Sequence, residues 1–503
     1  MTQEKHNSHN THKKHKRTVK RRGLEKIHPE CEGLTFQECE RTILQNVVDE
    51  LERTQGKELL GQPSIQEIIV LLEKFLIKKK RICYGGTAIN NLLPKKDQFY
   101  DLEVEFPDYD FYSPTPIEDA KQLADIFASN GYVNVEAKAG VHFGTYKVFV
   151  DFIPVADITQ MPLSLYRVLK KRTYVRKSIH YVPPNFLRMS MYLELSRPYG
   201  AISRWEKVFE RLNLLNKHYP LEGENCVTQK GKLSKEITIQ RVEDESMESS
   251  TLSALYRTTR RILIDHEVVF FGAYAHQLYS KYMPSSLRRK TREIPDFDVL
   301  CENVDEVSHV IKDALSALSN KEDGSTKSVK LVNHSAIGEL LPRHVEVRVG
   351  NESVCFLYEP LACHSYNTVT IRGDRLRIAT IDTMLSFYLA FLYMNRSYYD
   401  EQRLLCMSEF LFRVQERNRL AQKGVLRRFT MTCYGTQQTI RDIRAKKNRK
   451  HRELRKTMKK LRRTKAETGQ LEKVQREYEE WFFKYIPTQT PNAQKHLSIR
   501  SLT

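Results

Sequence analysis

The chain has 503 residues, of which 40% are hydrophobic, so it is long enough for two to four domains with buried cores. No apolar run is long enough to cross a bilayer, and the N-terminus lacks the apolar segment of a signal peptide. We therefore expect neither a membrane span nor secretion by that route. The net charge of +20 is concentrated at two places, because residues 1–23 carry +7 and residues 441–465 carry +12, which leaves +1 for the rest. Two basic segments on a nearly neutral body are typical of a chain that attracts a polyanion.

The first half of the chain predicts a basic tail followed by a mixed domain. Residues 1–35 are polar and rich in Lys and His, which favours disorder. A helical pattern over 36–80 contains the capping box Ser64-Ile-Gln-Glu67. The elements predicted after it are strands at 82–84, 108–112, 133–137 and 146–153, and helices at 118–130, 163–172, 184–195 and 204–216. We place this domain at 36–219, and residues 220–250 have the mixed charge of a linker.

The same order of elements returns in a second domain, which we place at 251–420. The predicted elements are helices at 251–266, 304–319, 380–394 and 400–418, and strands at 268–271, 296–300, 329–333 and 344–358. The C-terminal extension, residues 421–503, contains a charged segment that predicts one long helix over 436–484, ended by Pro487. The nine cysteines are scattered without a Cys-x-x-Cys motif, which argues against a zinc site and suits a reducing compartment.

One sequence phrase occurs twice. Arg81-Ile-Cys-Tyr-Gly-Gly-Thr-Ala-Ile-Asn90 precedes Pro107-Asp-Tyr-Asp-Phe-Tyr112, and Val268-Val-Phe-Phe-Gly-Ala-Tyr-Ala-His276 precedes Pro295-Asp-Phe-Asp-Val-Leu300. Each copy predicts an apolar strand, a small-residue turn, a helix and a strand with two aspartates. Carboxylates at i and i+2 of a strand emerge on the same face. Asp108 and Asp110 could therefore hold Mg²⁺ beside a glycine turn whose amides can meet phosphate.

A third carboxylate makes this interpretation more specific. A Gly-Gly turn or an Asp-x-Asp pair alone is more often an ordinary turn or a solvated strand edge. Asp151, however, lies within the apolar stretch Lys147-Val-Phe-Val-Asp-Phe-Ile-Pro154, where a charge is costly unless it is paired or bound to a metal. We expect Asp108, Asp110 and Asp151 to form a metal-binding triad, with a buried structural Asp151 as the alternative.

These segments resemble the polymerase-β-like nucleotidyltransferase superfamily. More closely, they resemble the poly(A) polymerase catalytic subunits of large nucleocytoplasmic DNA viruses, of the mimivirus, African swine fever virus and poxvirus type. The resemblance covers about residues 35–420. The segments that carry it are Tyr84-Gly-Gly-Thr-Ala-Ile-Asn-Asn91, Asp108-Tyr-Asp-Phe-Tyr112, Val150-Asp-Phe-Ile-Pro154, Tyr181-Val-Pro-Pro-Asn-Phe-Leu-Arg-Met-Ser-Met-Tyr192 and Arg204-Trp-Glu-Lys-Val208. The stretch between Gly86 and Asp108 is long for the superfamily, which implies an inserted loop.

The resemblance implies an α+β fold of two tandem polymerase-β-type nucleotidyltransferase domains. It also implies a two-metal transfer of AMP from ATP to the 3′-hydroxyl of RNA, with Mg²⁺ or Mn²⁺. Asp108 and Asp110 would then bridge both ions, and Asp151 would lie nearest the attacking hydroxyl. The candidate nucleotide contacts are Gly85, Gly86, Thr87, Arg188, Arg204 and Lys207. For each of the three cations, a solvated charge on a helix face is an equally good interpretation.

The second copy predicts a degenerate domain. Leu357 aligns with Asp151, and Ala273 and Tyr274 replace Gly86 and Thr87, so Asp296 and Asp298 lack a third partner unless Glu346 or Glu359 supplies one.

The C-terminal basic segment predicts a nucleic-acid contact. Residues 441–465 carry Lys or Arg on nearly every helical face, beside a thin apolar stripe. The candidate RNA contacts are Lys446, Lys447, Arg449 and Lys450. A solvated or coiled-coil helix is the alternative, and the basic N-terminus could be a nuclear localisation signal or another polyanion-binding arm.

The interpretation that accounts for these features is a template-independent poly(A) polymerase that uses ATP and acts on RNA 3′ ends, with viral mRNA as its target. We expect it in the host cytoplasm, at the viral factory, or in the virion, and the basic N-terminus leaves the nucleus open. It could work as a homodimer or with a viral processivity subunit, away from membranes. The alternatives are a terminal uridylyl or other nucleotidyltransferase, and a non-catalytic RNA-binding scaffold of the same fold.

Overall fold

The computed structural model describes residues 31, 34–60, 63–100, 107, 109–224, 226, 251–283, 296–319, 328–338, 340–396, 398–418, 421–463 and 468–488. The chain divides into two compact units, one formed by residues 1–62 with 103–105 and one by all remaining residues. In the smaller unit, α1 (Phe36–Leu60) begins with a capping box in which Thr35 and Glu38 exchange hydrogen bonds. Within the described residues, no helix is long and apolar enough to cross a membrane.

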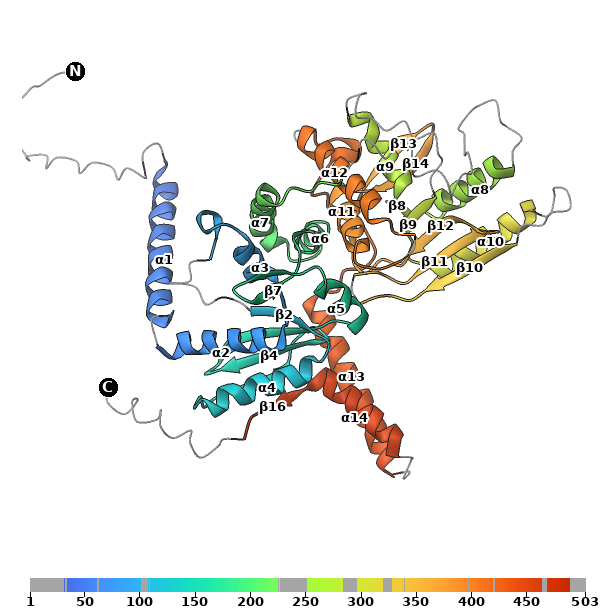
Figure 1. The fold of residues 1–503 in the computed structure, drawn as a ribbon. Coiled ribbons are helices and arrows are strands. Elements are labelled where there is room, and N and C mark those ends of the chain that lie inside the picture. Colours follow the sequence, from blue (N-terminus) through green and yellow to red (C-terminus); the bar gives the residue numbers. More distant parts are fainter. Residues whose placement is uncertain are drawn as a thin grey trace, which may run out of the picture. The chain divides into compact units, whose positions relative to one another are not determined.

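The described part of the larger unit contains two mixed sheets of eight strands (Figure 1). In the first sheet the order is β16-β3-β4-β5-β2-β1-β7-β6. The bounds are β1 Ile82–Tyr84, β2 Tyr109–Ser113, β3 Glu136–Ala139, β4 Thr145–Val150, β5 Ile153–Gln160, β6 Tyr174–Arg176, β7 Ile179–Tyr181 and β16 Lys484–Tyr485. The β5–β2 and β1–β7 pairs are parallel, and the other pairs are antiparallel.

The second sheet repeats this topology, with the order β10-β11-β12-β9-β8-β14-β13-β15. The bounds are β8 Val269–Phe270, β9 Phe297–Leu300, β10 Val329–His334, β11 His344–Val349, β12 Glu352–Tyr358, β13 His364–Ile371, β14 Asp374–Ala379 and β15 Cys433–Tyr434. Apart from β16 and β15, the two sheets have the same order of parallel and antiparallel pairs. This agreement follows the repeated phrase of the sequence.

Helices cover one face of each sheet and join the two. They are α2 Pro63–Lys79, α3 Gly85–Leu92, α4 Pro116–Ser129, α5 Leu163–Lys170, α6 Pro184–Leu195, α7 Trp205–His218, α8 Thr251–Asp265, α9 Ala273–Tyr279, α10 Val304–Ser319, α11 Ile381–Phe391 and α12 Glu401–Arg417. α4 packs on the first sheet, where the strands alternate buried and partly exposed residues. α6 packs against α11, and the ring of Phe186 lies 5.2 Å from that of Tyr393.

Two predicted strands are each a pair of strands. The sequence predicts a single strand over 146–153, but the chain reverses at Asp151 and Phe152, which have φ of 48° and 68° and separate β4 from β5. The predicted strand 344–358 likewise turns at Gly350 to give β11 and β12. Both apolar runs therefore form hairpins, because a tight turn with positive φ fits the twist of antiparallel strands.

The C-terminal extension folds back onto the first sheet. The single helix predicted over 436–484 is wrong, because α13 (Ile440–Arg463) and α14 (Thr468–Phe482) are separate helices that pack together as a hairpin (Figure 1). β16 then pairs with β3 at the edge of the first sheet. The Trp481 ring lies 4.5 Å from that of Phe143, and the Tyr146 hydroxyl donates to the Glu480 carbonyl at 2.9 Å.

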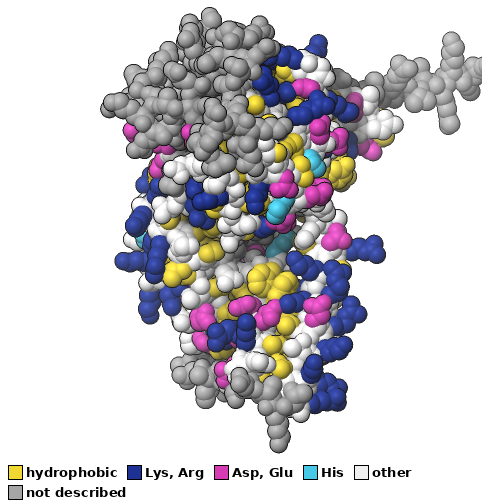
Figure 2. All heavy atoms as spheres, turned by 90° about the vertical axis from the view of Figure 1, so that its right-hand side faces the viewer, with side chains coloured by type: hydrophobic (Ala, Val, Ile, Leu, Met, Phe, Trp, Pro, Cys, Tyr) yellow, Lys and Arg dark blue, Asp and Glu magenta, His cyan; other side chains and the backbone are white. Residues whose placement is uncertain are grey.

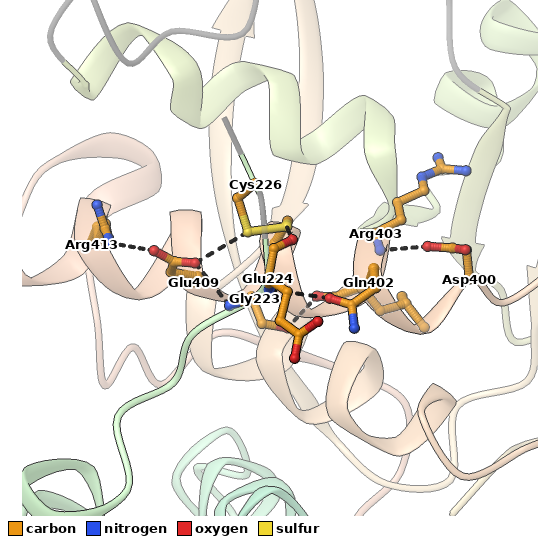
Figure 3. The surroundings of a disulfide bond; sticks show 11 residues. Gly223, Glu224, Cys226, Asp400, Gln402, Arg403, Glu409 and Arg413 are labelled. Atoms are coloured by element: carbon orange, nitrogen blue, oxygen red, sulfur yellow. Dashed lines mark hydrogen bonds and ion pairs between the residues drawn. A yellow bond between two sulfur atoms is a disulfide. The ribbon is translucent and has the colours of Figure 1, made fainter. Parts of the chain in front are cut away.

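Six of the nine cysteines form disulfides, although their separations of 8, 180 and 70 residues follow no motif. The pairs are Cys31–Cys39, Cys226–Cys406 and Cys363–Cys433. Figure 3 shows the second pair, where the segment after α7 lies on α12. The Gly223 amide donates to Glu409 at 2.9 Å and the Glu224 amide to Gln402 at 3.2 Å. Most of the predicted linker, residues 227–250, lies outside the described residues, as does the basic tail up to residue 30.

Candidate active site

Two aspartates face each other across parallel strands of the first sheet. Asp110 on β2 is the direct register partner of Asp157 on β5. Neighbouring strands lie about 4.8 Å apart, and paired residues project to the same face. In β2 the residues on either side of Asp110, Tyr109 and Phe111, are buried on the opposite face. The two carboxylates therefore share the face that α4 leaves open.

The strands at this point are held in register by aromatic side chains. The Tyr84 ring stacks on that of Tyr112 at 4.0 Å, and the Tyr84 hydroxyl lies 2.8 Å from Thr159 Oγ1. Tyr84 is also the cross-strand partner of Asp110. These contacts join β1, β2 and β5 and fix the spacing of the two carboxylates.

The glycine turn lies directly against Asp110. Gly85 begins α3 with φ of +71°, and a Cβ there would lie 2.5 Å from Asp110 Oδ2. A larger residue would therefore both strain the backbone and clash with the carboxylate. This arrangement puts the N-terminal amides of α3, which favour anions, beside the carboxylate pair.

An arginine that the sequence analysis missed lies over the second glycine. A Cβ on Gly86 would lie 2.9 Å from Arg211 Nη1 and would overlap the Tyr100 hydroxyl. The Arg211 guanidinium lies 4.3 Å from the Phe99 ring, and Asn90 Oδ1 accepts hydrogen bonds from the amides of Phe99 and Tyr100. Arg211 follows Arg204 and Lys207 at helical spacing, so the sequence held a signal for it.

A cation already lies at the carboxylates. Lys147 on β4 is the register partner of Asp157 and forms an ion pair with it. The two side chains are 36% and 27% exposed, so this positive charge reaches the pair from the open face. The site therefore accommodates positive charge beside Asp157.

Asp151 is not part of this arrangement, which corrects the predicted triad. It lies on the β4–β5 turn, partly exposed, and accepts a hydrogen bond from Asn134 Nδ2 at 3.1 Å. Asp151 precedes Asp157, the register partner of Asp110, by six residues. It therefore lies roughly 20 Å from Asp110 along the strand direction. The Asp151 carboxylate is not buried in an apolar strand, because the apolar segment 147–154 turns at Asp151 itself. The carboxylate beside Asp110 that the sequence analysis missed is Asp157.

The described residues fit a divalent cation in part. Carboxylate oxygens are the ligands that Mg²⁺ and Mn²⁺ prefer, and Asp110 and Asp157 supply them side by side. Asp108 lies outside the described residues. Among those that are described, no group of three or more His, Cys, Asp or Glu is placed to hold a metal ion.

The other predicted nucleotide contacts divide into three groups. Arg188 is fully buried and donates to Asn216 Oδ1 at 2.7 Å, to Asn185 and to the Tyr219 carbonyl, so it is a structural residue and not a nucleotide contact. Burial lowers the pKa of Arg188 to about 10. Thr87 is also buried, so its side chain is closed to a ligand at the surface. Arg204 and Lys207 are exposed, and Arg204 pairs with Glu194 at 3.3 Å.

The equivalent position of the second sheet has no second carboxylate. Asp298 on β9 pairs with Phe356 on β12, whereas Leu357, the residue expected there, pairs with Val299. Glu346 lies one strand further out, buried, and accepts from Arg348 at 2.6 Å. Burial, reinforced by Asp296, raises the pKa of Asp298 well above its usual range.

The four candidate RNA contacts on α13 differ in their surroundings. Lys447 donates to the Gly140 carbonyl at 2.7 Å, and Lys450 pairs with Glu477 of α14. Lys447 therefore holds the C-terminal hairpin onto the first sheet, and Lys450 holds the two helices of the hairpin together. Lys446 and Arg449 are exposed.

Part of the chain is similar to known poly(A) polymerase catalytic subunits. Residues 70–201 match the family model described as poly(A) polymerase catalytic subunit. A protein of African swine fever virus, described as a candidate poly(A) polymerase catalytic subunit, is 34% identical over 163 residues, which are 31% of this chain and 34% of that protein. A protein of Acanthamoeba polyphaga mimivirus with the same description is 37% identical over 168 residues, 32% of this chain and 28% of that protein. The chain thus matches about a third of the length of these relatives.

A solved structure covers nearly the whole chain. The crystal structure of the Megavirus polyadenylate synthase aligns with a TM-score of 0.66 and 20% identity, over 96% of this chain and 91% of that one. At this identity the match shows the fold. The chain therefore resembles the poly(A) polymerase catalytic subunit family through residues 70–201 and shares, over nearly all its length, the fold of a viral polyadenylate synthase.

Proposed function

We propose that the chain is a template-independent poly(A) polymerase that transfers AMP from ATP to the 3′-hydroxyl of RNA, with viral mRNA as its target. The observation that carries the proposal is the pairing of Asp110 with Asp157 beside the glycine turn of α3. Two carboxylates next to helix N-terminal amides are what a nucleotidyl transfer needs, since the reaction depends on positioning and charge neutralisation.

In this proposal, Asp108, Asp110 and Asp157 would hold two divalent ions, Mg²⁺ or Mn²⁺. The bound ions would lower the pKa of the RNA 3′-hydroxyl and neutralise charge on the triphosphate and the leaving pyrophosphate. Lys147, which pairs with Asp157, would have to leave that carboxylate for it to hold an ion.

The triphosphate would lie at the start of α3. The amides of Gly85 and Gly86 approach the phosphates, because neither residue has a side chain in the way. Arg211 lies within reach of the same turn and supplies a guanidinium, which binds phosphate oxygens through two parallel hydrogen bonds. Arg211 thus takes the role that the sequence analysis gave to Arg188.

The second sheet belongs to a degenerate copy of the same nucleotidyltransferase domain. Phe356 replaces the second carboxylate, and the side chain of Asp298 lies so close to Gly272 that a Cβ on this glycine would overlap it. This copy would therefore carry no chemistry and would support the first through α6 and α11.

The test is to incubate the full chain with a labelled RNA primer, Mg²⁺ and each of the four nucleoside triphosphates in turn. We expect extension by ATP in preference to the others. Extension mainly by UTP would make the chain a uridylyltransferase, and RNA binding without extension by any nucleotide would make it a scaffold of this fold.

A further inference from the structure

We infer that the acceptor RNA strand runs across the open face of the first sheet, along Lys147, Lys138 and Lys484, to the edge strand β16. This inference rests on the proposed function for its reaction, but its evidence is a separate feature of the sheet. We call these three residues the lysine row.

The lysine row is fixed by strand register. Asp157 on β5 pairs with Lys147 on β4, Lys147 pairs with Lys138 on β3, and Lys138 pairs with Lys484 on β16. Directly paired residues point to the same face, and strands lie about 4.8 Å apart, so the row extends about 14 Å from Asp157. At the ~3.4 Å rise of a stacked strand, this length matches about four nucleotides.

The row lies on the face that the helices leave open. The side chains of Lys147, Lys138 and Lys484 are 36%, 43% and 63% exposed, increasing away from the carboxylates. Their neighbours Ala137 and Val148 are buried on the opposite face, the side on which α4 packs. A polyanion can therefore reach all three ammonium groups from one side.

The charge of the row exceeds that of its partners. Lys138 and Lys484 share the carboxylate of Glu136, and Lys147 pairs with Asp157. In the proposed reaction Asp157 is needed at the metal site, which leaves three lysines facing one glutamate. The Phe149 ring lies 4.1 Å from Lys138 Nζ, and cations interleaved with aromatic rings are typical of surfaces that bind single-stranded nucleic acid.

The direction of the strand follows from in-line displacement. The attacking and leaving oxygens lie on opposite sides of the reacting phosphorus. The glycine turn and Arg211 occupy the β1 side of the carboxylates. In the proposed function, the pyrophosphate would leave on this side. The acceptor hydroxyl must then come from the β5 side, and the lysine row begins there.

The C-terminal hairpin extends this path. The lysine row ends at β16, which directly follows α14, and α13 contacts the β3–β4 turn through Lys447 and Gly140. Figure 2 shows Lys and Arg side chains gathered along one side of the lower end of the molecule, where this hairpin lies. RNA that leaves the row would next meet the exposed cations of α13, such as Lys446 and Arg449.

The experiment measures RNA binding without ATP, by fluorescence anisotropy of 5′-labelled pentaadenylate across a salt series. The variant is the double substitution Lys138→Gln and Lys484→Gln, which leaves the carboxylates and Lys147 intact. The salt slope is the steepness with which log K for RNA binding falls with log[salt]. Loss of two phosphate contacts should lower this slope by about 1.4, so the loss of affinity between 50 and 200 mM salt becomes about sevenfold smaller.

Two controls make the result specific. Lys74→Gln with Lys78→Gln removes the same charge from exposed positions of α2, a helix that packs against α4, and should leave the slope unchanged. Lys138→Arg with Lys484→Arg should restore wild-type binding. The exposed ion pairs to Glu136 contribute little to stability, so the melting temperature should stay within a few degrees of the wild type.

The outcomes separate this inference from the proposed function. The salt slope of the Lys138/Lys484 double variant could stay at the wild-type value, or it could fall equally in the α2 control. Either result overturns the RNA path along the lysine row and leaves the proposed extension of RNA by ATP unaffected. Conversely, the wild type could extend no RNA while only the Lys138/Lys484 double variant, and not the α2 control, loses affinity for RNA. That result supports the RNA path along the lysine row and shows that the proposed reaction is wrong.

Discussion

Substituting each of two aspartates of one hairpin, Asp157→Asn and Asp151→Asn, separates the structural account from the sequence-based triad. Asp157 faces Asp110 across parallel strands, whereas Asp151 lies on the β4–β5 turn. Both substitutions remove one negative charge and keep the size of the side chain. Only Asp157→Asn should therefore abolish RNA extension.

The magnitudes follow from the surroundings of each residue. Metal-assisted charge stabilisation contributes several kcal/mol, so losing a ligand should slow single-turnover extension about 10³-fold or more, at about 1.4 kcal/mol per factor of ten. The Asp157–Lys147 pair is partly exposed, so its loss costs at most about 1 kcal/mol of stability. At Asp151 only the hydrogen bond to Asn134 changes, worth about 1 kcal/mol, and asparagine tolerates the positive φ of this turn.

The assay is single-turnover extension of a labelled RNA primer at saturating ATP and Mg²⁺, with thermal melting of each variant beside it. Asp110→Asn serves as the inactive reference. An Asp157→Asn protein that folds and extends RNA within tenfold of the wild-type rate would refute the reasoning, as would an Asp151→Asn protein that folds and is as inactive as Asp110→Asn.

Three further predictions concern the surroundings of the site. Arg211→Gln should raise the KM for ATP about tenfold or more, the loss expected for a charge-assisted hydrogen bond, while RNA affinity measured by anisotropy stays unchanged; equal losses of both would place Arg211 elsewhere. Arg188→Leu should lower stability by about 3 kcal/mol or more in urea titration, because Asn185, Asn216 and a backbone carbonyl lose a buried donor, and a stable Arg188→Leu protein with poor ATP binding would contradict its structural role. Asp298→Asn should retain most extension activity, since Phe356 leaves that position without a second carboxylate, and full inactivation of a folded protein would show that the second sheet takes part in the chemistry.

The repeat was the part of the fold that could be predicted from the sequence. Strand, glycine turn, helix and Asp-aromatic-Asp strand recur in both copies, and the two sheets share their strand order. The third carboxylate could not be assigned in the same way. The run from Lys147 to Ile158 is apolar almost throughout and contains two aspartates, and a single extended strand would bury the first. A reversal at Asp151 and Phe152 places that aspartate on a turn and brings Asp157 to the sheet face.

The sequence analysis missed Arg211, the proposed nucleotide contact, for a similar reason. Arg188 lies in a segment that resembles the family, but resemblance does not show which face of α6 is buried, and packing of α6 against α11 accompanies the burial of that arginine. Arg211 lies on the same helix face as Arg204. The sequence does not show that Gly86 lies within reach of Arg211, because only the fold brings these two residues together.

The lysine row could not be found from the sequence either. It joins Lys147 and Lys138, on adjacent strands of one hairpin, to Lys484 near the other end of the chain. No motif links these positions, because only the return of the C-terminal hairpin brings β16 beside β3. Long-range strand pairing of this kind is set by packing of the whole unit and leaves no local pattern.

The most direct test of the central claim is to locate the metal site in the folded chain. Fe²⁺ can replace Mg²⁺ at carboxylate sites. With hydrogen peroxide as the oxidant, and ascorbate to return Fe³⁺ to Fe²⁺, it generates hydroxyl radicals that cleave the backbone nearest to where it binds. With ATP present, we expect cleavage around Gly85, Asp110 and Asp157, competed by Mg²⁺ and lost in Asp157→Asn. Cleavage around Asn134 and Asp151 instead, or the same pattern in Asp157→Asn, would contradict the account.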